Sequence, residues 1–537
     1  MPSLACALTR SIWHAAHKRH NPPYLSVTIF LSEGRYSFVG EEAYWLSTIT
    51  FRDMNALAAN ADFFGVSYGE QMANAGRVAA GQIMRSDLRR STLVVCGTGY
   101  ISGAGLAMAR YLKEAGYPVQ VILLESPGHI EDVPVREKLE ALKVLDVPLI
   151  EADTPEKVQG ADFEGADVIV DALSGAGPVE AGKVAIARIN RSRAYKISLD
   201  MPGGYRQDAG ERVEHVEPDE IIAFHAPKAG LEQYNASVVD VGIPQRAVTY
   251  VGPGDLANMQ IRGDVSHKGH SGGKVLVIGG GPYVGGPALA ALAALRTGSD
   301  LVAIAAPQRA ADIIASNSLD LVVWPLSNRD VIVDEDIERL RYLIERHEVV
   351  VMGMGMGGDP RTMSAILKIL PICKKMVIDA SALIPGYPFT GIITPHHSEF
   401  KHISGMIPGP DAVQNAAMAR EFSARQGVVT LLKGPVDVIS DGSRVRMNCT
   451  GNPGMTVSGT GDVLSGIVGS LYCKNPAFEA ACCGAFLSGL AGNMAFRDRG
   501  FGLTATGVID MIPQALKKYH PGYRKTMESL SLLRYRL

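Results

Sequence analysis

The residues best suited to chemistry lie in the string NPGMTVSGTGDVLSGIVGSL, which spans residues 452–471. The four small residues Ser458 to Gly461 come directly before Asp462 and before an apolar run that predicts a helix. Free N–H groups at a helix start, together with the positive end of the helix dipole, can hold a phosphoryl group. Asp462, in the first turn, could then take a proton from an attacking hydroxyl. The alternative is that Asp462 only caps the helix, but capping does not need four small residues in front of it.

A lysine at the end of an apolar strand is the second candidate. Lys433 lies in the string LLKGPVD and is followed by Gly434 and Pro435, so a loop could wrap a nucleotide there. Its ammonium group would then meet phosphate charge. The alternative is a lysine that only projects into water from the end of a strand.

Two further strings follow strands in the same way. TPHHSEF places His396 and Glu399 just past the strand GIIT, at a carboxyl end where open α/β sheets bind ligands. A lone histidine is more often structural than functional. The run GMGMGG, residues 353–358, would let a ligand approach the backbone closely, although many tight turns look alike.

These residues must be positioned by alternating strands and helices, which predict an α/β protein with mainly parallel sheets. We expect two helices between Met54 and Gly76, and a linker near residues 242–272 where Gly, Pro and polar residues gather. The first unit has expected strands at 92–96, 119–124, 167–173, 196–200, 221–225 and 237–242. The second has them at 274–280, 349–354, 376–380, 391–395, 428–434 and 436–440. We expect helices in the second unit at 288–298, 416–427 and 463–473.

Composition excludes several classes of function. The 537 residues carry 52 Lys and Arg against 55 Asp and Glu, so we expect neither nucleic acid nor a membrane surface as a partner. Seven scattered Cys without paired CxxC spacing suit neither a disulfide framework nor a zinc site. No apolar run is long enough to span a bilayer. We therefore expect a cytoplasmic protein that binds small molecules.

The motifs of the second half occur in an order that resembles a known family. HKGHSGGKVLVIGGGPYVGGPALAALAALRTG is followed by GMGMGG, VIDASAL, TPHHSEF, LLKGPVD and NPGMTVSGTGD. Across about residues 265–510 this order resembles the ADP- or ATP-dependent NAD(P)H-hydrate dehydratases, which have a ribokinase-like fold. In that family a nucleotide phosphorylates the hydroxyl of the hydrated nicotinamide ring, and loss of phosphate restores NADH or NADPH. Bacterial and archaeal members use ADP and eukaryotic members use ATP.

The resemblance also implies roles for particular residues. Asp462 would be the catalytic base, with Mg²⁺ accompanying the nucleotide. The residues implied to bind ADP are Lys433, Gly434, Pro435, Val436, Asp437, Gly459, Thr460 and Gly461. The residues implied to line the hydrated-dinucleotide site are Gly286, Gly355, His396 and Asp462. Two departures stand out: Ser458 replaces a usual Gly, and Ser381 replaces the second Asp of a DAD-like motif, which would weaken magnesium binding or loop positioning.

Residues of about 50–245 resemble the NAD(P)H-hydrate epimerase that precedes the dehydratase in bifunctional repair enzymes. The strings that carry this resemblance are NALAANADFFGVSYGEQMANAG, LVVCGTGYISGAGLAMARYLKEAGY, VIVDALSGAG, ISLDMPGG and FHAPKAGL. The functional motif has changed, however, because the family pattern is close to GxGNNGGDG and this chain has GTGYISGAG at residues 97–105. Ile101 cannot replace the Asn that would bind potassium, since a hard cation needs oxygen ligands.

Part of the epimerase-like site is retained. Asp171 and Asp200 occupy the positions of the ion-binding and substrate-contacting aspartates, while Gly203 replaces the family's Ser. We do not expect Asp171 alone to hold potassium. Gly99 and Gly103, with the other glycines of the motif, could still shape a turn that accepts phosphate, so dinucleotide binding without epimerisation is an option.

Together these features predict an N-terminal three-layer Rossmann-like domain followed by a C-terminal ribokinase-like α/β domain. The expected boundaries are an N-terminal extension at 1–48, either disordered or the product of a mis-assigned start codon, an epimerase-like domain at 49–245, a dehydratase domain at 246–517 and a basic tail at 518–537. We expect a homo-oligomer that acts on hydrated NADH and NADPH (NADHX and NADPHX) with ADP. The alternatives are a fully bifunctional enzyme, a ribokinase-like small-molecule kinase, and a pair of binding modules without activity.

Overall fold

The computed structural model describes residues 48–85, 91–173, 179–206, 214–262 and 272–521. The predicted N-terminal extension and nearly all of the predicted C-terminal tail lie outside these residues, as do most residues of the string HKGHSGG. Within the described ranges, no helix has the length and apolar character needed to cross a membrane.

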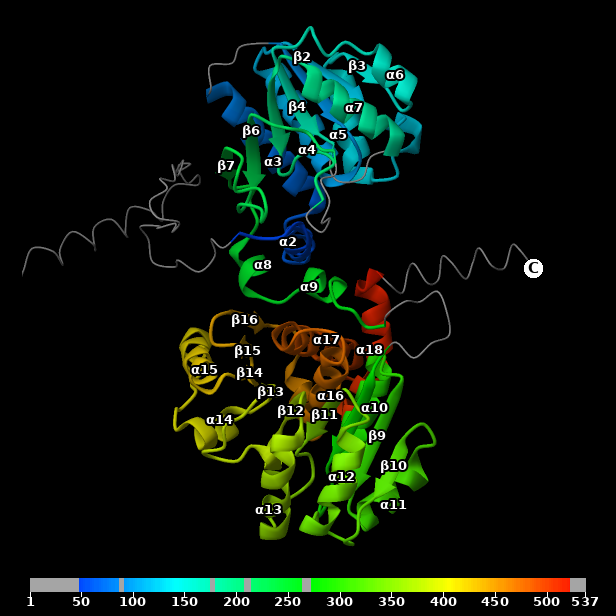
Figure 1. The fold of residues 1–537 in the computed structure, drawn as a ribbon, viewed down its shortest axis with the longest axis vertical. Helices are drawn as coiled ribbons and strands as arrows, with labels where there is room; N and C mark the ends of the chain where they lie inside the picture. The colour runs from blue at the N-terminus through cyan, green and yellow to red at the C-terminus, as the bar shows by residue number, and fades with distance from the viewer. Residues whose placement is uncertain (1–47, 86–90, 174–178, 207–213, 263–271, 522–537) are drawn as a thin grey trace, which may run out of the picture. The chain divides into compact units, whose positions relative to one another are not determined.

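The first sheet is parallel throughout and has the strand order β3-β2-β1-β4-β5-β6-β7 (Figure 1). Its strands are β1 (Thr92–Cys96), β2 (Val119–Leu123), β3 (Leu149–Glu151), β4 (Val168–Ala172), β5 (Tyr195–Leu199), β6 (Glu220–Phe224) and β7 (Ala236–Val239). The central strands β1 and β4 are buried along their whole length, as expected where helices cover both faces of a parallel sheet.

The helices of the first unit are α2 (Phe51–Phe63), α3 (Tyr68–Arg85), α4 (Gly99–Glu114), α5 (Val133–Val144), α6 (Pro155–Gly160) and α7 (Val179–Arg191). Helix α4 follows β1 directly, and its buried face packs against the sheet and against α3. Helices α6 and α7 contribute to an apolar cluster with Leu93, Val95 and Ile169. The two helices predicted between Met54 and Gly76 are confirmed as α2 and α3.

The second sheet has the strand order β10-β9-β8-β11-β12-β13-β14-β15-β16. Its strands are β8 (Lys274–Ile278), β9 (Leu301–Ala306), β10 (Val322–Pro325), β11 (Val349–Met352), β12 (Met376–Ile378), β13 (Ile392–Ile393), β14 (Val429–Leu432), β15 (Asp437–Ser440) and β16 (Val445–Asn448). All neighbouring strands are parallel up to β14, and β15 and β16 continue the sheet as antiparallel strands. The prediction of mainly parallel α/β sheets is confirmed for both units.

Helices cover both faces of this second sheet. They are α10 (Gly285–Thr297), α11 (Gln308–Asn317), α12 (Ile337–Ile344), α13 (Pro360–Ile369), α14 (His397–Ser404), α15 (Ala412–Gln426), α16 (Thr460–Tyr472), α17 (Ala477–Arg499) and α18 (Ala505–Tyr519). Successive side chains of a strand point to opposite faces, so Val275 and Val277 join one apolar cluster with α10, α16, α17 and α18. Leu276 and Ile278 join the other, with α12 to α15.

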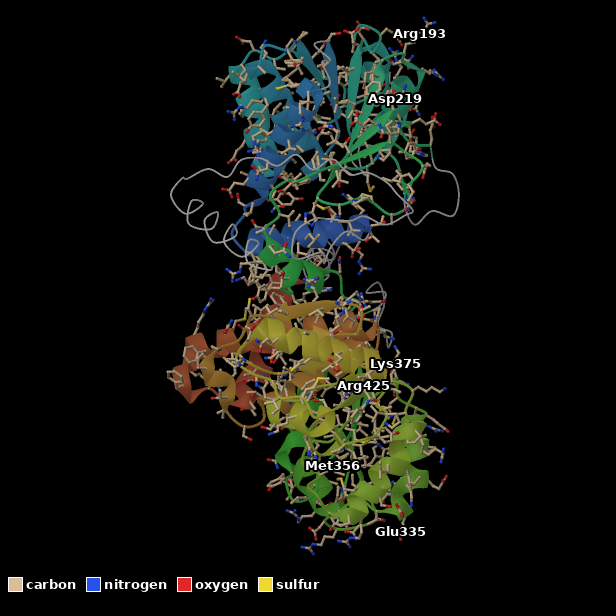
Figure 2. All side chains as sticks on the ribbon, turned by 90° about the vertical axis from the view of Figure 1, so that its left-hand side faces the viewer. Arg193, Asp219, Glu335, Met356, Lys375 and Arg425 are labelled. Carbon is tan, nitrogen blue, oxygen red and sulfur yellow. The ribbon has the colours of Figure 1, made fainter. Side chains whose placement is uncertain are left out.

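Helix α16 is buried beyond its first turn. Residues 463–472 of it are all buried, and Gly466 approaches α10 so closely that a Cβ there would lie 2.0 Å from the backbone oxygen of Ala290. In Figure 2 the side chains of Arg193, Asp219, Glu335 and Arg425 lie on the outside of the ribbon, and all four residues are exposed. Met356, in the glycine-rich loop after β11, is fully buried. The N-terminus of α16 is therefore held by a tightly packed scaffold.

The predicted linker contains two short helices. They are α8 (Gln245–Thr249) and α9 (Pro253–Ala257). Asp255 in α9 accepts a hydrogen bond from Arg446 of β16, at 2.8 Å to Nη2. The described part of this segment is thus packed structure, not an open connection.

Candidate active site

Five neighbouring strands of the second sheet end beside the candidate residues. The loop after β8 leads to Gly286 in the first turn of α10, and the segments directly after β11, β12, β13 and β14 carry Gly355, Asp379, His396 and Lys433, respectively. Carboxyl ends of parallel strands share one edge of the sheet, where open α/β sheets bind their ligands. The strands and the N-terminus of α16 thus converge on one site.

A left-handed glycine starts α16. Gly459 has φ +95°, a conformation that glycine adopts without the strain that a side chain would add. The Thr460 hydroxyl lies 2.7 Å from the Met455 carbonyl oxygen and 3.1 Å from that of Val457, which fixes the loop in front of the helix. In the described chain no side chain caps this helix start. Its first N–H groups therefore remain available to an anion.

Asp462 lies in the first turn of α16, beside the start of α10. A Cβ on Gly286 would lie 3.2 and 3.3 Å from the two carboxylate oxygens of Asp462, so only a hydrogen fits there comfortably. Burial raises the pKa of Asp462 to about 6, and the negative charge of Asp379 adds to this, while Lys433 acts in the opposite direction. A carboxyl with such a pKa is ionised near neutral pH and basic enough to accept a proton.

The ammonium group of Lys433 lies below the glycine loop. Its Nζ donates to Asp379 Oδ1 at 2.9 Å and is 3.9 Å from Glu399 Oε2. It is also 3.4 Å from the position that a Cβ on Gly461 would take. Burial lowers the pKa of Lys433, but the carboxylates of Asp379 and Glu399 more than offset this, so the pKa is raised. The helix start and a fixed positive charge thus face the same space.

His396 has a structural function at the edge of the site. Its Nδ1 accepts hydrogen bonds from the backbone N–H groups of Ser398 and Glu399 at 3.2 and 3.3 Å, and Glu399 in turn accepts from the His396 N–H at 2.7 Å. This is a capping box at the start of α14. The imidazole remains half exposed, and its backbone pairs with Lys433. His396 caps the helix, and the exposed part of its imidazole can still contact a ligand.

The glycine-rich loop after β11 packs against the loop after β8. Gly355 has φ +74°, and a Cβ there would lie 2.3 Å from the Tyr283 carbonyl oxygen. Any larger residue at position 355 would push the two loops apart. Since the loop after β8 leads into α10, Gly355 helps to position Gly286 beside Asp462.

The loop KGPVD uses its aspartate internally. Asp437 accepts hydrogen bonds from the Gly434 N–H at 3.0 Å and from Asn448 at 2.9 Å. Burial raises the pKa of Asp437 to about 6. Gly434 and Pro435 are exposed, and Val436 is partly buried against an apolar cluster. The carboxylate shapes the turn, which leaves the exposed backbone of the loop for a ligand.

Three polar residues of the site were not singled out from the sequence. Asp379, Ser465 and Thr394 are all buried and linked by hydrogen bonds at the base of the site. Asp379 directly follows a strand, which is the same pattern that identified Lys433. The hydroxyl residues resemble ordinary core polar residues, and only the fold shows that they meet.

The aspartates retained in the first unit are bound within the protein. Asp171 is 1% exposed and accepts hydrogen bonds from the Ser198 hydroxyl at 2.7 Å and from the N–H groups of Gly203 and Leu173 at 2.6 and 3.0 Å. Burial raises the pKa of Asp171, and these hydrogen bonds counteract the rise. Most of the lone pairs of this carboxylate are thus already in use.

Asp200 forms a closed ion pair. Its side chain and that of Lys228 are only 2% and 1% exposed, and they contact each other directly. Lys228 also donates to the carbonyl oxygens of Phe224 and Ala226 at 2.8 and 3.0 Å, and Asp200 accepts from the Phe224 N–H at 2.8 Å. All three donors of the ammonium group are satisfied by the protein. Asp200 has φ +64°, a conformation rare for a residue with a side chain.

Apolar and aromatic groups fill the region where the altered motif begins α4. Ile101 is buried, and the ring of Tyr100 lies 5.2 Å from that of Tyr68 and 6.5 Å from that of Phe224, between centroids. The Tyr100 hydroxyl is buried and has no hydrogen-bond partner among the described residues. Since Ile101 offers no oxygen and Asp171 is already bonded, these residues do not fit a potassium ion.

The glycines of this motif have different surroundings. Gly99 has φ +71°, and a Cβ there would meet nothing within 4 Å, so this glycine serves the turn. A Cβ on Gly103 would lie 2.5 Å from the Met72 sulfur of α3. Gly103 therefore allows α3 and α4 to pack closely and lies within the helix, away from its start.

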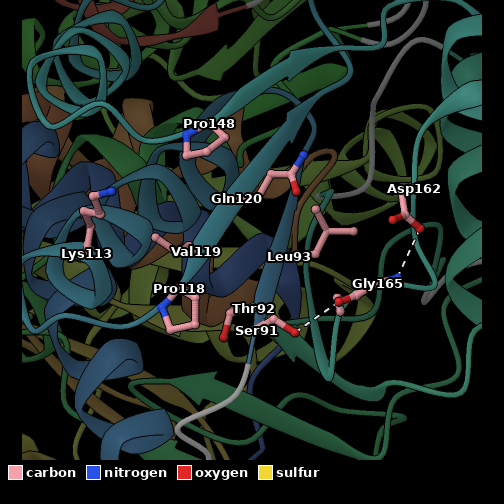
Figure 3. A pocket seen from close by; sticks show the side chains of 11 residues that line it. Ser91, Thr92, Leu93, Lys113, Pro118, Val119, Gln120, Pro148, Asp162 and Gly165 are labelled. Carbon is pink, nitrogen blue, oxygen red and sulfur yellow. Dashed lines mark hydrogen bonds between the residues drawn. The ribbon is translucent and has the colours of Figure 1, made fainter.

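A cavity of about 340 Å³ lies at the opposite, amino-terminal edge of the first sheet (Figure 3). It is lined by residues at the starts of β1 and β2, among them Ser91 and Gln120, and by Lys113 in the last turn of α4. The Ser91 hydroxyl donates to the Gly165 carbonyl oxygen, and the Gly165 N–H donates to Asp162, so these polar groups already have partners. None of the residues expected to bind a ligand lines this cavity.

Comparison with known proteins assigns both halves. Residues 275–514 match the family model described as NAD(P)H-hydrate dehydratase, and residues 69–230 match the YjeF-related protein N-terminus. The bifunctional NAD(P)H-hydrate repair enzyme Nnr of Archaeoglobus fulgidus is 38% identical over 87% of this chain and 98% of its own length. The enzyme of the same name from Pyrobaculum aerophilum is 38% identical over 88% of this chain and 99% of its own.

A solved structure matches about half of the chain. It is the ADP/ATP-dependent NAD(P)H-hydrate dehydratase from Bacillus subtilis, co-crystallised with ATP and Mg²⁺, which is 23% identical, covers 51% of this chain and 99% of its own, and has a TM-score of 0.45. The two relatives correspond to this chain over nearly their whole length, through both halves. The chain therefore belongs to the family of bifunctional NAD(P)H-hydrate repair enzymes.

Proposed function

We propose that the second half of the chain is an ADP-dependent dehydratase that converts (S)-NADHX and (S)-NADPHX back to NADH and NADPH. The observation that carries this proposal is the position of Asp462, in the first turn of α16, with Lys433 and the uncapped helix start facing the same space. That arrangement holds a base and an anion site together.

Asp462 takes the proton of the substrate hydroxyl while the hydroxyl oxygen forms a bond to the terminal phosphorus of ADP. The bond between that phosphorus and the bridging oxygen breaks, and AMP leaves. Lys433 and the N–H groups after Gly459 balance the charge that moves between the oxygens. Loss of phosphate from the ring carbon, with a ring proton removed, then restores the double bond of the nicotinamide.

Exposed backbone and glycines provide room for the two ligands. We propose that the nucleotide contacts Lys433, Gly434, Pro435 and Val436, with Asp437 shaping that loop, and that its phosphates meet Gly459, Thr460 and Gly461. The hydrated dinucleotide would contact Gly286, Gly355 and His396. Because Gly286 has no side chain, the backbone at the start of α10 lies close to the Asp462 carboxylate, and a hydroxyl bound beside that backbone would be within reach of the carboxylate.

Mg²⁺ fits this site only together with the nucleotide. The described residues contain no group of three His, Cys, Asp or Glu placed to hold a metal ion. Mg²⁺ usually keeps several waters and binds one or two carboxylates plus substrate phosphates. Glu399, partly exposed beside Lys433, would supply such a carboxylate, and the ion would neutralise phosphate charge.

For the first half we propose that epimerase activity has been lost. Asp200 and Lys228 are paired out of contact with water, and Tyr100 and Ile101 replace two amides of the family motif. The relatives named above carry both halves, so full bifunctionality is the alternative that an assay must exclude. We retain residues 49–245 and 246–517 as the proposed extents of the two domains. The cytoplasmic location and the homo-oligomer stay predictions.

The test is recovery of NADH absorbance from purified epimers of hydrated NADH, with ADP or ATP. We expect ADP-dependent recovery from the S epimer, and recovery from the R epimer no faster than spontaneous epimerisation. Rapid recovery from the R epimer would show that the first half is active. A phosphorylated dinucleotide that accumulates would instead favour the kinase alternative, and absence of any nucleotide-dependent change would contradict the dehydratase.

A further inference from the structure

Asp379 lies at the bottom of the dehydratase site, directly after β12. Its side chain is 3% exposed, and its backbone N–H donates to the Met352 carbonyl oxygen at 2.9 Å. A Cβ on Gly353 would lie 1.7 Å from the Asp379 carbonyl oxygen, so the chain can pass here only because residue 353 is glycine. The position of Asp379 is thus fixed by the ends of two adjacent strands.

The two carboxylate oxygens of Asp379 contact different parts of the site. Oδ1 accepts from Lys433 Nζ at 2.9 Å, at the end of β14. Oδ2 accepts from the Ser465 hydroxyl at 2.7 Å, in α16. Ser465 lies one turn after Asp462 on that helix, and its hydroxyl is 3.3 Å from that of Thr394 at the end of β13. One buried carboxylate therefore connects the lysine to the helix that carries the base.

We propose that Asp379 is a positioning residue, which orients Lys433 toward phosphate and fixes α16 so that Asp462 faces the same ligand. This inference rests on the proposed dehydratase function. With one ammonium hydrogen bonded to Asp379, the other two donors of Lys433 remain for oxygens on the side of Gly461. Asp379 itself is not the base, because both of its oxygens are occupied and it is shielded from water.

The charge of Asp379 also acts on Asp462. Asp379, Glu399 and Lys433 are the charged groups that face Asp462, from the ends of β12 and β14 and from α14. The two carboxylates raise the pKa of Asp462 and Lys433 lowers it, after the larger effect of burial. Neutralising Asp379 should therefore lower the pKa of Asp462. If Asp379 served stability alone, through its ion pair with Lys433, its neutralisation would leave the pH dependence of kcat/KM unchanged.

The first experiment compares the full chain with Asp379→Asn by ADP titration in a calorimeter and by kinetics from pH 5 to pH 8. We expect the Kd and KM for ADP to rise about tenfold, since a charge-assisted hydrogen bond that orients Lys433 is lost. We also expect the acid limb of the kcat/KM profile to move to lower pH. Ser465→Ala is the matched variant, because it removes the bond between α16 and Asp379, with the weaker contacts of that hydroxyl to Thr394 and the Gly461 carbonyl oxygen, and keeps the bond between Asp379 and Lys433. It should lower kcat while leaving the ADP Kd within about twofold.

A double-variant cycle covers the case in which Asp379→Asn does not fold. Lys433→Gln combined with Asp379→Asn removes both charges, which proteins often tolerate better than one unpaired charge. If Asp379 acts through Lys433, the double variant binds ADP no more weakly than Lys433→Gln alone. A further tenfold loss in the double variant would overturn the proposal.

Other results separate this inference from the proposed function. An Asp379→Asn protein with a lower Tm but unchanged ADP affinity and an unchanged pH profile would make Asp379 purely structural. If the wild-type chain binds ADP without converting hydrated NADH, the proposed dehydratase activity is wrong. The ADP affinities of the double-variant cycle still decide whether Asp379 orients Lys433. If the wild-type chain does not bind ADP, both proposals fail.

Discussion

The carboxyl edges of the two sheets hold the same kinds of residue in opposite states. In the second half, Lys433 and Asp462 remain partly accessible, and a glycine loop with free N–H groups stands beside them. In the first half, Asp200 and Lys228 are sealed against each other, and Asp171 is bonded by three donors. A charged pair can act on a ligand only if part of its hydrogen-bonding capacity is unused. Under the proposed function, this comparison corresponds to a working site in the second half and a structural remnant of one in the first.

Glycine usage differs between the halves in the same direction. Gly286 and Gly461 let backbone lie close to the charged groups of the site: a Cβ on Gly286 would lie 3.2 Å from the Asp462 carboxylate, and one on Gly461 would lie 3.4 Å from the Lys433 ammonium group. Gly103 and Gly105 leave space that Met72 and Ala172 already fill. Glycine thus brings backbone close to charged side chains in one half and close to apolar side chains in the other. Substitutions at these charged residues test whether this distinction carries the function.

The largest effect is expected from Asp462→Asn. The amide cannot accept the hydroxyl proton, so kcat/KM for (S)-NADHX with ADP should fall by about 10³-fold, within the range ascribed to a general base. Recovery of NADH absorbance measures this. The matched control is Asp510→Asn, at an exposed position of α18, which should leave activity unchanged. Activity within tenfold of the wild type would mean that another group accepts the proton.

The buried ion pair between Asp200 and Lys228 should affect the free energy of unfolding of the first half and leave dehydratase activity unchanged. Lys228→Met leaves Asp200 charged and unpaired, which should destabilise this half by about 3 kcal/mol. Faster hydrogen exchange in peptides of β5 and β6 would report it. Dehydratase kcat and KM should stay within about twofold. A change in turnover of the R epimer in this variant would instead show that the pair participates in catalysis.

Lys433→Ala should have the next largest effect, on the nucleotide. The loss of a charged hydrogen bond to phosphate corresponds to about 2 kcal/mol, or roughly a thirtyfold rise in the KM for ADP. Lys375→Ala, at a partly buried lysine that contacts the Tyr472 carbonyl oxygen, is a control for loss of positive charge and should leave that KM unchanged. An unchanged KM in Lys433→Ala would remove this lysine from the nucleotide site.

Much of this site could be predicted from the sequence because its residues follow strands. Strand ends and glycine-rich turns can be recognised locally, and parallel strands bring their carboxyl ends to one edge. The strands β3, β9 and β10 were not predicted individually. The antiparallel strand β16 was also not singled out, although β15 was.

The hydrogen bonds that join distant segments could not be predicted in this way. Asp379 contacts Ser465, which lies 86 positions further along the chain, and no local pattern announces such a pair. The sequence showed that Ser381 replaces the second Asp of the DAD-like motif, but it did not single out Asp379, which is the first Asp of that motif. In the first half the altered motif predicts loss of the potassium ligands, and this stays a prediction. The contacts of the Tyr100 ring with Tyr68 and Phe224, and the pairing of Lys228 with Asp200, follow only from the packing.

The pH dependence gives the smallest effect and the sharpest contrast. Asp462 must be ionised to accept a proton, and burial raises its pKa to about 6, so activity should be lost as the pH falls through that value. We expect kcat/KM to be half-maximal near pH 6 and to fall about tenfold for each further unit, because only the deprotonated fraction reacts. Initial rates with saturating ADP, checked against thermal unfolding at each pH, would measure this limb. A profile that stays flat down to pH 5 would mean that the base is an ordinary exposed carboxylate, and the distinction drawn here between a partly buried, open site and a sealed one would then lose its kinetic support.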